Sequence, residues 1–148
     1  MRSRLLFLTV LLIIICASCQ PTKKKTEPEK EAVTGATYTN PLRERGAEPW
    51  AVFYKGKYYY TQGSENRIML WETNDITNLN DSLERSVWIP TDPSNSHHLW
   101  APEMHRINNK WYIYFAADDG NMDNHQSYLI ENDAAIPTEG KFVMKGRI

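Results

Sequence analysis

Two acidic residues occupy similar places beside proline and tryptophan in this sequence. Glu48 directly precedes Pro49-Trp50, and Glu103 directly follows Trp100-Ala101-Pro102. Two carboxylates on opposite sides of a substrate can act as general base and general acid, so residue type alone makes Glu48 and Glu103 a candidate pair. Simpler interpretations stay open at this point: Glu48 as an exposed acid before a strand, and Glu103 as a buried, hydrogen-bonded structural glutamate.

A second group of polar residues follows later in the chain. Asp118, Asp119 and Asp123 precede His125, and oxygen ligands with a histidine are donors that calcium or transition metals use. Their spacing fits no metal-binding loop motif, so we expect neither a metal nor another cofactor. The His97-His98 pair is expected to lie in a solvated loop.

The elements that must position these side chains are β-strands. Short runs of aromatic and β-branched residues alternate with Gly, Asn and Asp, which is typical of an all-β fold. The expected strands are Trp50 to Tyr54, Lys57 to Gln62, Arg67 to Glu72, Lys110 to Ala116 and Gln126 to Glu131. Lys55-Gly56 and Asn108-Asn109 separate adjacent runs and suit two-residue turns with positive φ, so they predict two hairpins.

The chain also contains an internal repeat with a shift of 53 residues. Pro49 then matches Pro102, and Lys57 to Tyr60 matches Lys110 to Ile113. A period of roughly 40 to 50 residues with four short strands is that of a β-propeller blade. The residues near Trp88 can supply the outermost strand of the first unit.

We therefore expect two blades, with residues 141–148 in the outer strand of the second. Because propellers close with about four to eight blades, the chain is expected to be a fragment of a longer propeller. The alternative is a complete small β-sandwich.

The first 19 residues have the features of an export signal. Two arginines lie within Met1 to Arg4, and Leu5 to Ile15 is apolar except for Thr9. This run is shorter than the roughly 20 residues that a transmembrane helix needs. It ends at Cys16-Ala17-Ser18-Cys19, which resembles a bacterial lipoprotein box with Cys19 as the lipidated residue. Ordinary secretion and an uncleaved anchor are the alternatives, and all three predict export.

The remaining chain divides by composition. Residues 20–35 are rich in Lys, Glu, Thr and Pro and predict a disordered tether, which leaves residues 36–148 as the folded part. Both cysteines lie in the signal, so no disulfide is expected in the folded part. The net charge of −1 gives no reason to expect a nucleic-acid partner, and Lys23-Lys24-Lys25 is expected to be a solvated part of the tether.

Five segments, taken in order, carry a resemblance to a known family. They are Ala47-Glu48-Pro49-Trp50, the strand ending Tyr58-Tyr59-Tyr60-Thr61, Arg67 to Asp75, Leu99 to His105, and Trp111 to Gly120 followed by Asn124-His125. Together they resemble glycoside hydrolase family 43, and within it the α-L-arabinofuranosidases most closely. The resemblance implies a five-bladed β-propeller with an active site at the centre of one face.

The resemblance also implies a set of site residues. Family members use a general base, a general acid and a third carboxylate that raises the pKa of the acid, and they hydrolyse with inversion. The base position is Glu48, where the family pattern has an aspartate. The acid and the third carboxylate belong to later blades, beyond Ile148, which argues against Glu103 as the acid. The implied substrate-binding residues are Trp50, Trp100, Glu103, His105, Asn124 and His125.

Two functions are therefore considered from the sequence. The first is an inverting, arabinofuranosidase-like glycoside hydrolase that acts on oligo- or polysaccharides containing arabinose, is truncated before its general acid, and is anchored to a membrane through Cys19 at the periplasm or cell surface. The alternative is a non-catalytic glycan-binding lipoprotein or decayed pseudoenzyme.

Overall fold

The computed structural model describes residues 37–148. The predicted signal, the lipidation at Cys19 and the tether lie outside these described residues. Within them, no helix is long and apolar enough to cross a membrane.

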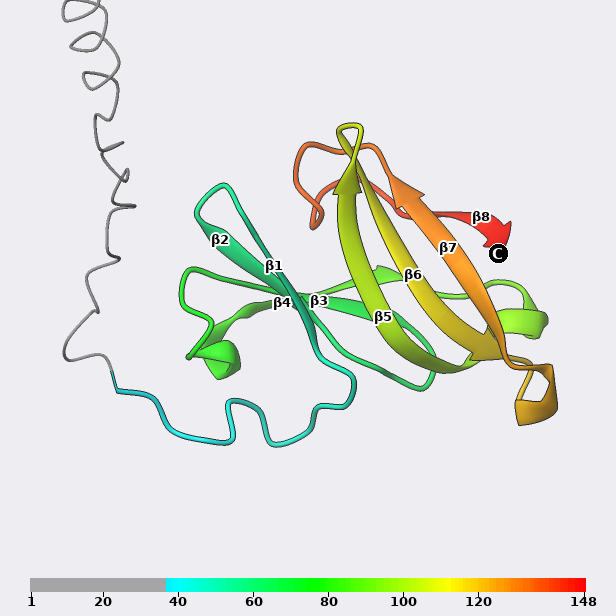
Figure 1. Ribbon diagram of the computed structural model, residues 1–148, viewed down its shortest axis with the longest axis horizontal. Helices are drawn as coiled ribbons and strands as arrows, with labels where there is room; N and C mark the ends of the chain where they lie inside the picture. Colours follow the sequence, from blue (N-terminus) through cyan, green and yellow to red (C-terminus); the bar gives the residue numbers. More distant parts are fainter. Residues whose placement is uncertain (1–36) are drawn as a thin grey trace, which may run out of the picture. The chain divides into compact units, whose positions relative to one another are not determined.

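The described chain forms two four-stranded antiparallel sheets whose strands follow one another in chain order (Figure 1). The first sheet consists of β1 (Trp50–Tyr54), β2 (Lys57–Thr61), β3 (Ile68–Thr73) and β4 (Leu83–Trp88). The second consists of β5 (His97–Ile107), β6 (Lys110–Asp118), β7 (Gln126–Asn132) and β8 (Val143–Arg147). Three short 3-10 helices, η1 (Leu79–Asp81), η2 (Pro93–Asn95) and η3 (Met122–Asn124), lie in the connections. The all-β prediction is confirmed.

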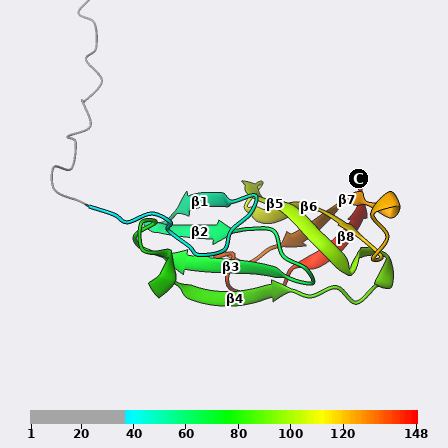
Figure 2. The ribbon, with the colours of Figure 1, turned by 90° about the horizontal axis from the view of Figure 1, so that it is seen from below.

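The internal repeat corresponds to these two sheets. Trp50 pairs with Thr61 across β1 and β2, and Glu103 pairs with Tyr114 across β5 and β6, so equivalent pairs are 53 residues apart. Figure 2 shows β1 to β4 side by side in chain order, which is the strand order of a propeller blade. The total of five blades remains a prediction.

Both predicted hairpin turns are present. Lys55 and Gly56 have φ of 50° and 80°, and Asn108 and Asn109 have φ of 49° and 66°. Two successive residues with positive φ give the turn whose twist matches that of the flanking strands. The turns therefore fix the register of β1 with β2 and of β5 with β6.

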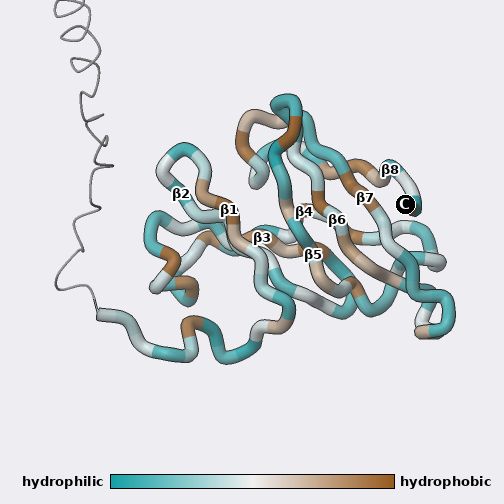
Figure 3. The backbone as a smooth tube through the Cα atoms, in the orientation of Figure 1, coloured by the Kyte–Doolittle hydropathy of each residue, from teal (hydrophilic) through white to brown (hydrophobic). Residues whose placement is uncertain are grey.

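A shared hydrophobic core joins the two sheets. Trp111 on β6 is fully buried, and its ring lies 5.1 Å from that of Tyr54 on β1 and 6.2 Å from that of Tyr59 on β2. Alternate residues of β6 are buried, as expected for a strand with one face in the core. Figure 3 shows the hydrophobic stretches, in brown, on strands such as β6 and β7. This core fixes the position of the first sheet relative to the second.

One prediction for the second sheet is wrong. The His97-His98 pair does not lie in a solvated loop, because β5 begins at His97. The strand extends this far because β6 continues to Asp118, which pairs with His97. The ladder is irregular between His97 and Glu103, and both His98 and Ala101 have positive φ there, of 50° and 46°.

Candidate functional site

A cleft of ≈ 850 Å³ opens where the first strands of the two sheets begin. It is lined by Arg45, Gly46, Ala47, Glu48, Gln62, Gly63, Ser64, Glu65 and Trp100. The structure thus brings together Glu48, the predicted base, and Trp100, a predicted sugar-binding residue from the other sheet.

The backbone at Glu48 is held in an unusual conformation. Glu48 has φ of 53°, and Ala101, its equivalent in the second unit, has φ of 46°. Such left-handed conformations cost a non-glycine residue about 1 to 3 kcal/mol and are found most often at functional sites. In both units the strained residue directly precedes the motif proline, so the strain belongs to the start of the inner strand.

The Glu48 side chain connects the two sheets. Its Oε2 accepts a hydrogen bond from the backbone N–H of Ala101 at 2.7 Å. Gly63 packs closely behind this oxygen, since a Cβ added to Gly63 would lie 2.9 Å from it. Oε1 accepts no hydrogen bond from residues 37–148. The carboxylate is therefore aimed by one oxygen and has the other available to a water molecule.

A second polar cluster lies next to Trp100. The fully buried Asp118 carboxylate accepts hydrogen bonds from Nδ1 of His98 at 2.9 Å, from Nδ1 of His125 at 2.8 Å and from the Gly120 N–H at 2.8 Å. Burial alone raises the pKa of Asp118, but the hydrogen bonds from His125, Gly120 and His98 outweigh it and lower the pKa to about 2. Asp118 therefore stays ionised at neutral pH.

The two histidines also contact the indole ring of Trp100. The ring centroids of His98 and His125 lie 5.4 Å and 5.0 Å from it, in tilted arrangements. The predicted residue His125 is thus connected through Trp100 to the cleft that contains Glu48.

The loop after β6 is organised by polar turns. Asn124 is exposed at the end of η3 and donates a hydrogen bond from Nδ2 to Oδ2 of Asp119 at 2.9 Å. Asn121 caps η3 by accepting from the N–H of Asp123 at 3.1 Å. Within residues 37–148, no three His, Cys, Asp or Glu side chains converge in a way that could hold a metal ion.

The remaining predicted residues lie farther along the inner strands. Trp50 donates from Nε1 to the carbonyl of Met104 at 2.8 Å, and its ring lies 5.1 Å from that of His105. His105 lies 3.6 Å from the carboxylate of the exposed Glu103. None of Trp50, Glu103 and His105 lines the cleft, and their contact with substrate stays a prediction.

The sequence interpretation missed the roles of His98 and Asp118 at this site. The predicted hairpin at Asn108-Asn109 gives the register of β5 with β6 only as far as Glu103, and beyond it two shifts bring His97 opposite Asp118. The irregular ladder between His97 and Glu103 conceals that register from strand periodicity.

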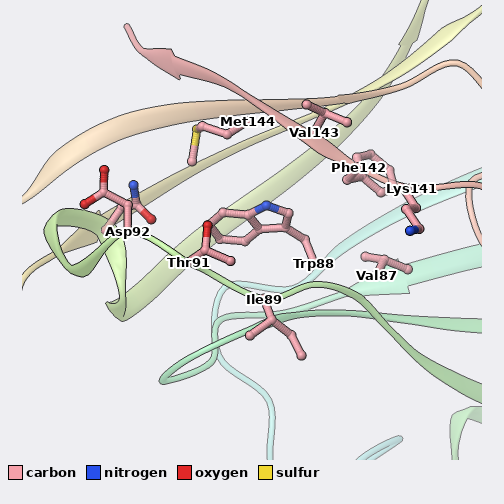
Figure 4. A pocket seen from close by; sticks show the side chains of 10 residues that line it. Val87, Trp88, Ile89, Thr91, Asp92, Lys141, Phe142, Val143 and Met144 are labelled. Carbon is pink, nitrogen blue, oxygen red and sulfur yellow. The ribbon is translucent and has the colours of Figure 1, made fainter.

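A second hollow, of ≈ 590 Å³, lies between the outer strands β4 and β8 (Figure 4). Its lining is mainly apolar, with Trp88, Phe142 and Met144 among its side chains and Asp92 as its one carboxylate. This hollow contains none of the residues that the family resemblance assigns to the site, so the cleft at Glu48 is the better candidate.

The family model for glycosyl hydrolases family 43 matches residues 38–148, nearly all of the described chain. The chain belongs to this family. Its family-43 relatives include two proteins named extracellular exo-α-(1→5)-L-arabinofuranosidase. The one from Streptomyces avermitilis is 32% identical over 148 residues, which is 97% of this chain and 30% of the relative. The one from Streptomyces chartreusis is 34% identical over 119 residues, which is 76% of this chain and 36% of the relative.

A solved family-43 structure agrees with this assignment. The α-L-arabinofuranosidase from Lactobacillus brevis matches with a TM-score of 0.67 and 31% identity, over 75% of this chain and 38% of that structure. The family-43 chain described here therefore spans about a third of the length of these relatives.

Proposed function

We propose that this family-43 chain serves in a glycoside hydrolase that cleaves arabinose-containing polysaccharides with inversion, with Glu48 as the general base. The observation that carries the proposal is the Glu48 carboxylate, fixed through Oε2 to the Ala101 N–H and open at Oε1 within a cleft that Trp100 also lines. The names of the Streptomyces and Lactobacillus relatives support arabinose as the sugar.

The proposed chemistry follows from the cleft. A water molecule held by Oε1 of Glu48 loses a proton to the carboxylate as its oxygen attacks the anomeric carbon, and the glycosidic oxygen leaves with a proton from a general acid on the other face. In an inverting site the two carboxyl groups stand about 6.5 to 9.5 Å apart, so that the water fits between base and sugar. Glu103 is exposed and outside the cleft; by the family resemblance, the acid belongs to a later blade.

The reaction is tested by following the product. A form of the protein that includes the later blade with the general acid is incubated with linear α-1,5-arabinan, and the anomeric proton of newly released arabinose is recorded by NMR before mutarotation. We expect the β-anomer first, because inversion converts the α-linkage. An initial α-anomer would contradict inversion while leaving glycosidase activity intact.

A non-catalytic glycan-binding function is the second candidate. It is favoured by one specific observation: Glu48 stands where the family pattern has an aspartate, and its longer side chain is already engaged with Ala101. Binding of arabino-oligosaccharides without any release of arabinose would support this function over hydrolysis.

We also propose that the protein is exported and held at a membrane through a lipid on Cys19. The support is the sequence of residues 1–19 and the word extracellular in the names of the Streptomyces relatives. We expect Cys19→Ala to prevent acylation and to move the mature protein out of the membrane fraction, or to leave its signal unprocessed. Labelling with a radioactive fatty acid and cell fractionation measure this. Unchanged labelling and processing in the variant would contradict lipidation, and Cys16→Ala is the matched control.

A further inference from the structure

The two histidines that contact Trp100 each direct Nδ1 at the Asp118 carboxylate. Asp118 is ionised and accepts from Nδ1 of both His98 and His125. A carboxylate can only accept, so each Nδ1 must carry the proton, and a neutral ring then presents an unprotonated Nε2. No hydrogen bond within residues 37–148 engages either Nε2, and the two side chains remain 26% and 24% exposed. In their neutral form the two rings therefore offer two aimed hydrogen-bond acceptors.

These acceptors flank an aromatic surface. The indole of Trp100 contacts both imidazoles and also lines the cleft beside Glu48. A sugar presents C–H groups on its ring faces and hydroxyl donors at its edges, and sites for such ligands combine aromatic walls with a few fixed polar groups. The indole of Trp100 can pack against a furanose ring, and the Nε2 atoms of neutral His98 and His125 can accept hydrogen bonds from two of its hydroxyls.

We propose that His98 completes a sugar subsite with Trp100 and His125, the two residues already expected to bind sugar, and that Asp118 is the positioning residue of this subsite. The inference rests on the proposed function, because it deepens how the same site binds its saccharide. Asp118 touches no ligand. It keeps both rings in one orientation and one tautomer, and through them it holds the indole.

The first test is spectroscopic and needs no ligand. In protein labelled with ¹⁵N in histidine, we expect the wild-type His98 and His125 to show a protonated Nδ1 and an unprotonated Nε2 at pH 7.5. In Asp118→Asn, the amide oxygen can keep the bonds to Gly120 and His98, which leaves the amide NH₂ facing Nδ1 of His125. His125 should then change to the Nε2–H tautomer. A wild-type histidine of this pair already protonated on Nε2 would overturn the positioning role.

The second test is binding of α-1,5-linked arabinotriose, measured by calorimetry on the full chain. His125→Phe keeps a ring against Trp100 but removes the acceptor, and the loss of one good hydrogen bond should weaken binding about tenfold. Asp118→Asn should weaken it by a similar factor. His97→Gln is the matched control, because the exposed His97 side chain lies on the same strand and contacts Ser96 and the ring of His98. This variant should bind arabinotriose as tightly as the wild-type protein.

The outcomes separate the two proposals. If the wild-type protein binds arabinotriose and the His125 and Asp118 variants bind it equally well, the subsite is overturned and the proposed function stands. If the wild-type protein binds neither arabinotriose nor xylotriose, both proposals fall. A circular dichroism spectrum equal to that of the wild type is required of each variant, and where Asp118→Asn unfolds, His98→Phe takes its place with the same expected loss of affinity.

Discussion

In a full-length form that includes the general acid, replacing Glu48 by glutamine is expected to lower the rate of arabinan hydrolysis by about 10²- to 10⁴-fold, the usual contribution of a general base. The amide keeps the shape of the side chain but cannot take the proton of the attacking water. Affinity for arabino-oligosaccharides should change little, since the substitution removes a proton acceptor and not a sugar contact. Reducing-sugar release and calorimetry measure the two quantities separately.

A shorter acid at this position gives the opposite expectation. The additional methylene of glutamate displaces the carboxylate by roughly 1.5 Å relative to aspartate, and misplacement of about 1 Å can cost about 10²-fold in rate. Glu48→Asp should therefore raise turnover, because the family pattern has an aspartate here. A loss of activity in this variant would instead mean that the reach of Glu48 to the Ala101 N–H is required.

Glu65 provides the control for both variants. It is an exposed carboxylate in the same cleft, and no role is assigned to it. Glu65→Gln should leave hydrolysis unchanged. If Glu48→Gln turns over arabinan like the parent, the base is elsewhere; if parent and variants all bind sugar without turnover, the glycan-binding function is the correct one.

Replacing Trp111 by alanine should destabilise the protein by about 3 to 5 kcal/mol, the usual cost of removing a large buried aromatic side chain. Trp111 is fully buried between the sheets, against Tyr54, Tyr59 and the Arg106 guanidinium, which lies 5.1 Å from its ring. Urea unfolding followed by far-ultraviolet circular dichroism measures the change in the free energy of unfolding.

Two control variants test whether the loss of stability comes from the buried ring of Trp111. Trp111→Phe should cost less, because it keeps an aromatic ring and removes an indole N–H that has no hydrogen-bond partner among the described residues. Phe53→Ala should cost under about 1 kcal/mol, since Phe53 is 61% exposed. Equal effects of Trp111→Ala and Phe53→Ala would show that the sheets do not share the core described here.

Local chemistry made most of the fold predictable. Two-residue turns need positive φ, which Lys55-Gly56 and Asn108-Asn109 adopt. The aromatic and β-branched runs on either side of each turn favour strands, so both hairpins were predictable from short-range rules. The resemblance to family 43 implied that Glu48 and Trp100 belong to one site, and both line the same cleft.

The interior of the site was harder to foresee. Asp118 is an acidic residue at the end of a strand, a place where a solvated side chain is the common outcome, and only the approach of two histidines from other segments makes its burial favourable. Likewise, the engagement of Glu48 with a backbone N–H 53 residues away depends on how the two sheets pack. Sequence periodicity carries information on neither contact.

The hydrogen bond between Glu48 and Ala101 has a consequence for how such a protein can change. The two residues occupy the same position in the two repeat units, and one supplies the acceptor while the other supplies the donor: Glu48 contributes its carboxylate, and Ala101 contributes its backbone N–H. Residue 101 contributes only its backbone, but its φ of 46° disfavours β-branched side chains there, and proline would remove the donor. The direction in which the Glu48 carboxylate points therefore depends on how precisely the two repeat units stay aligned.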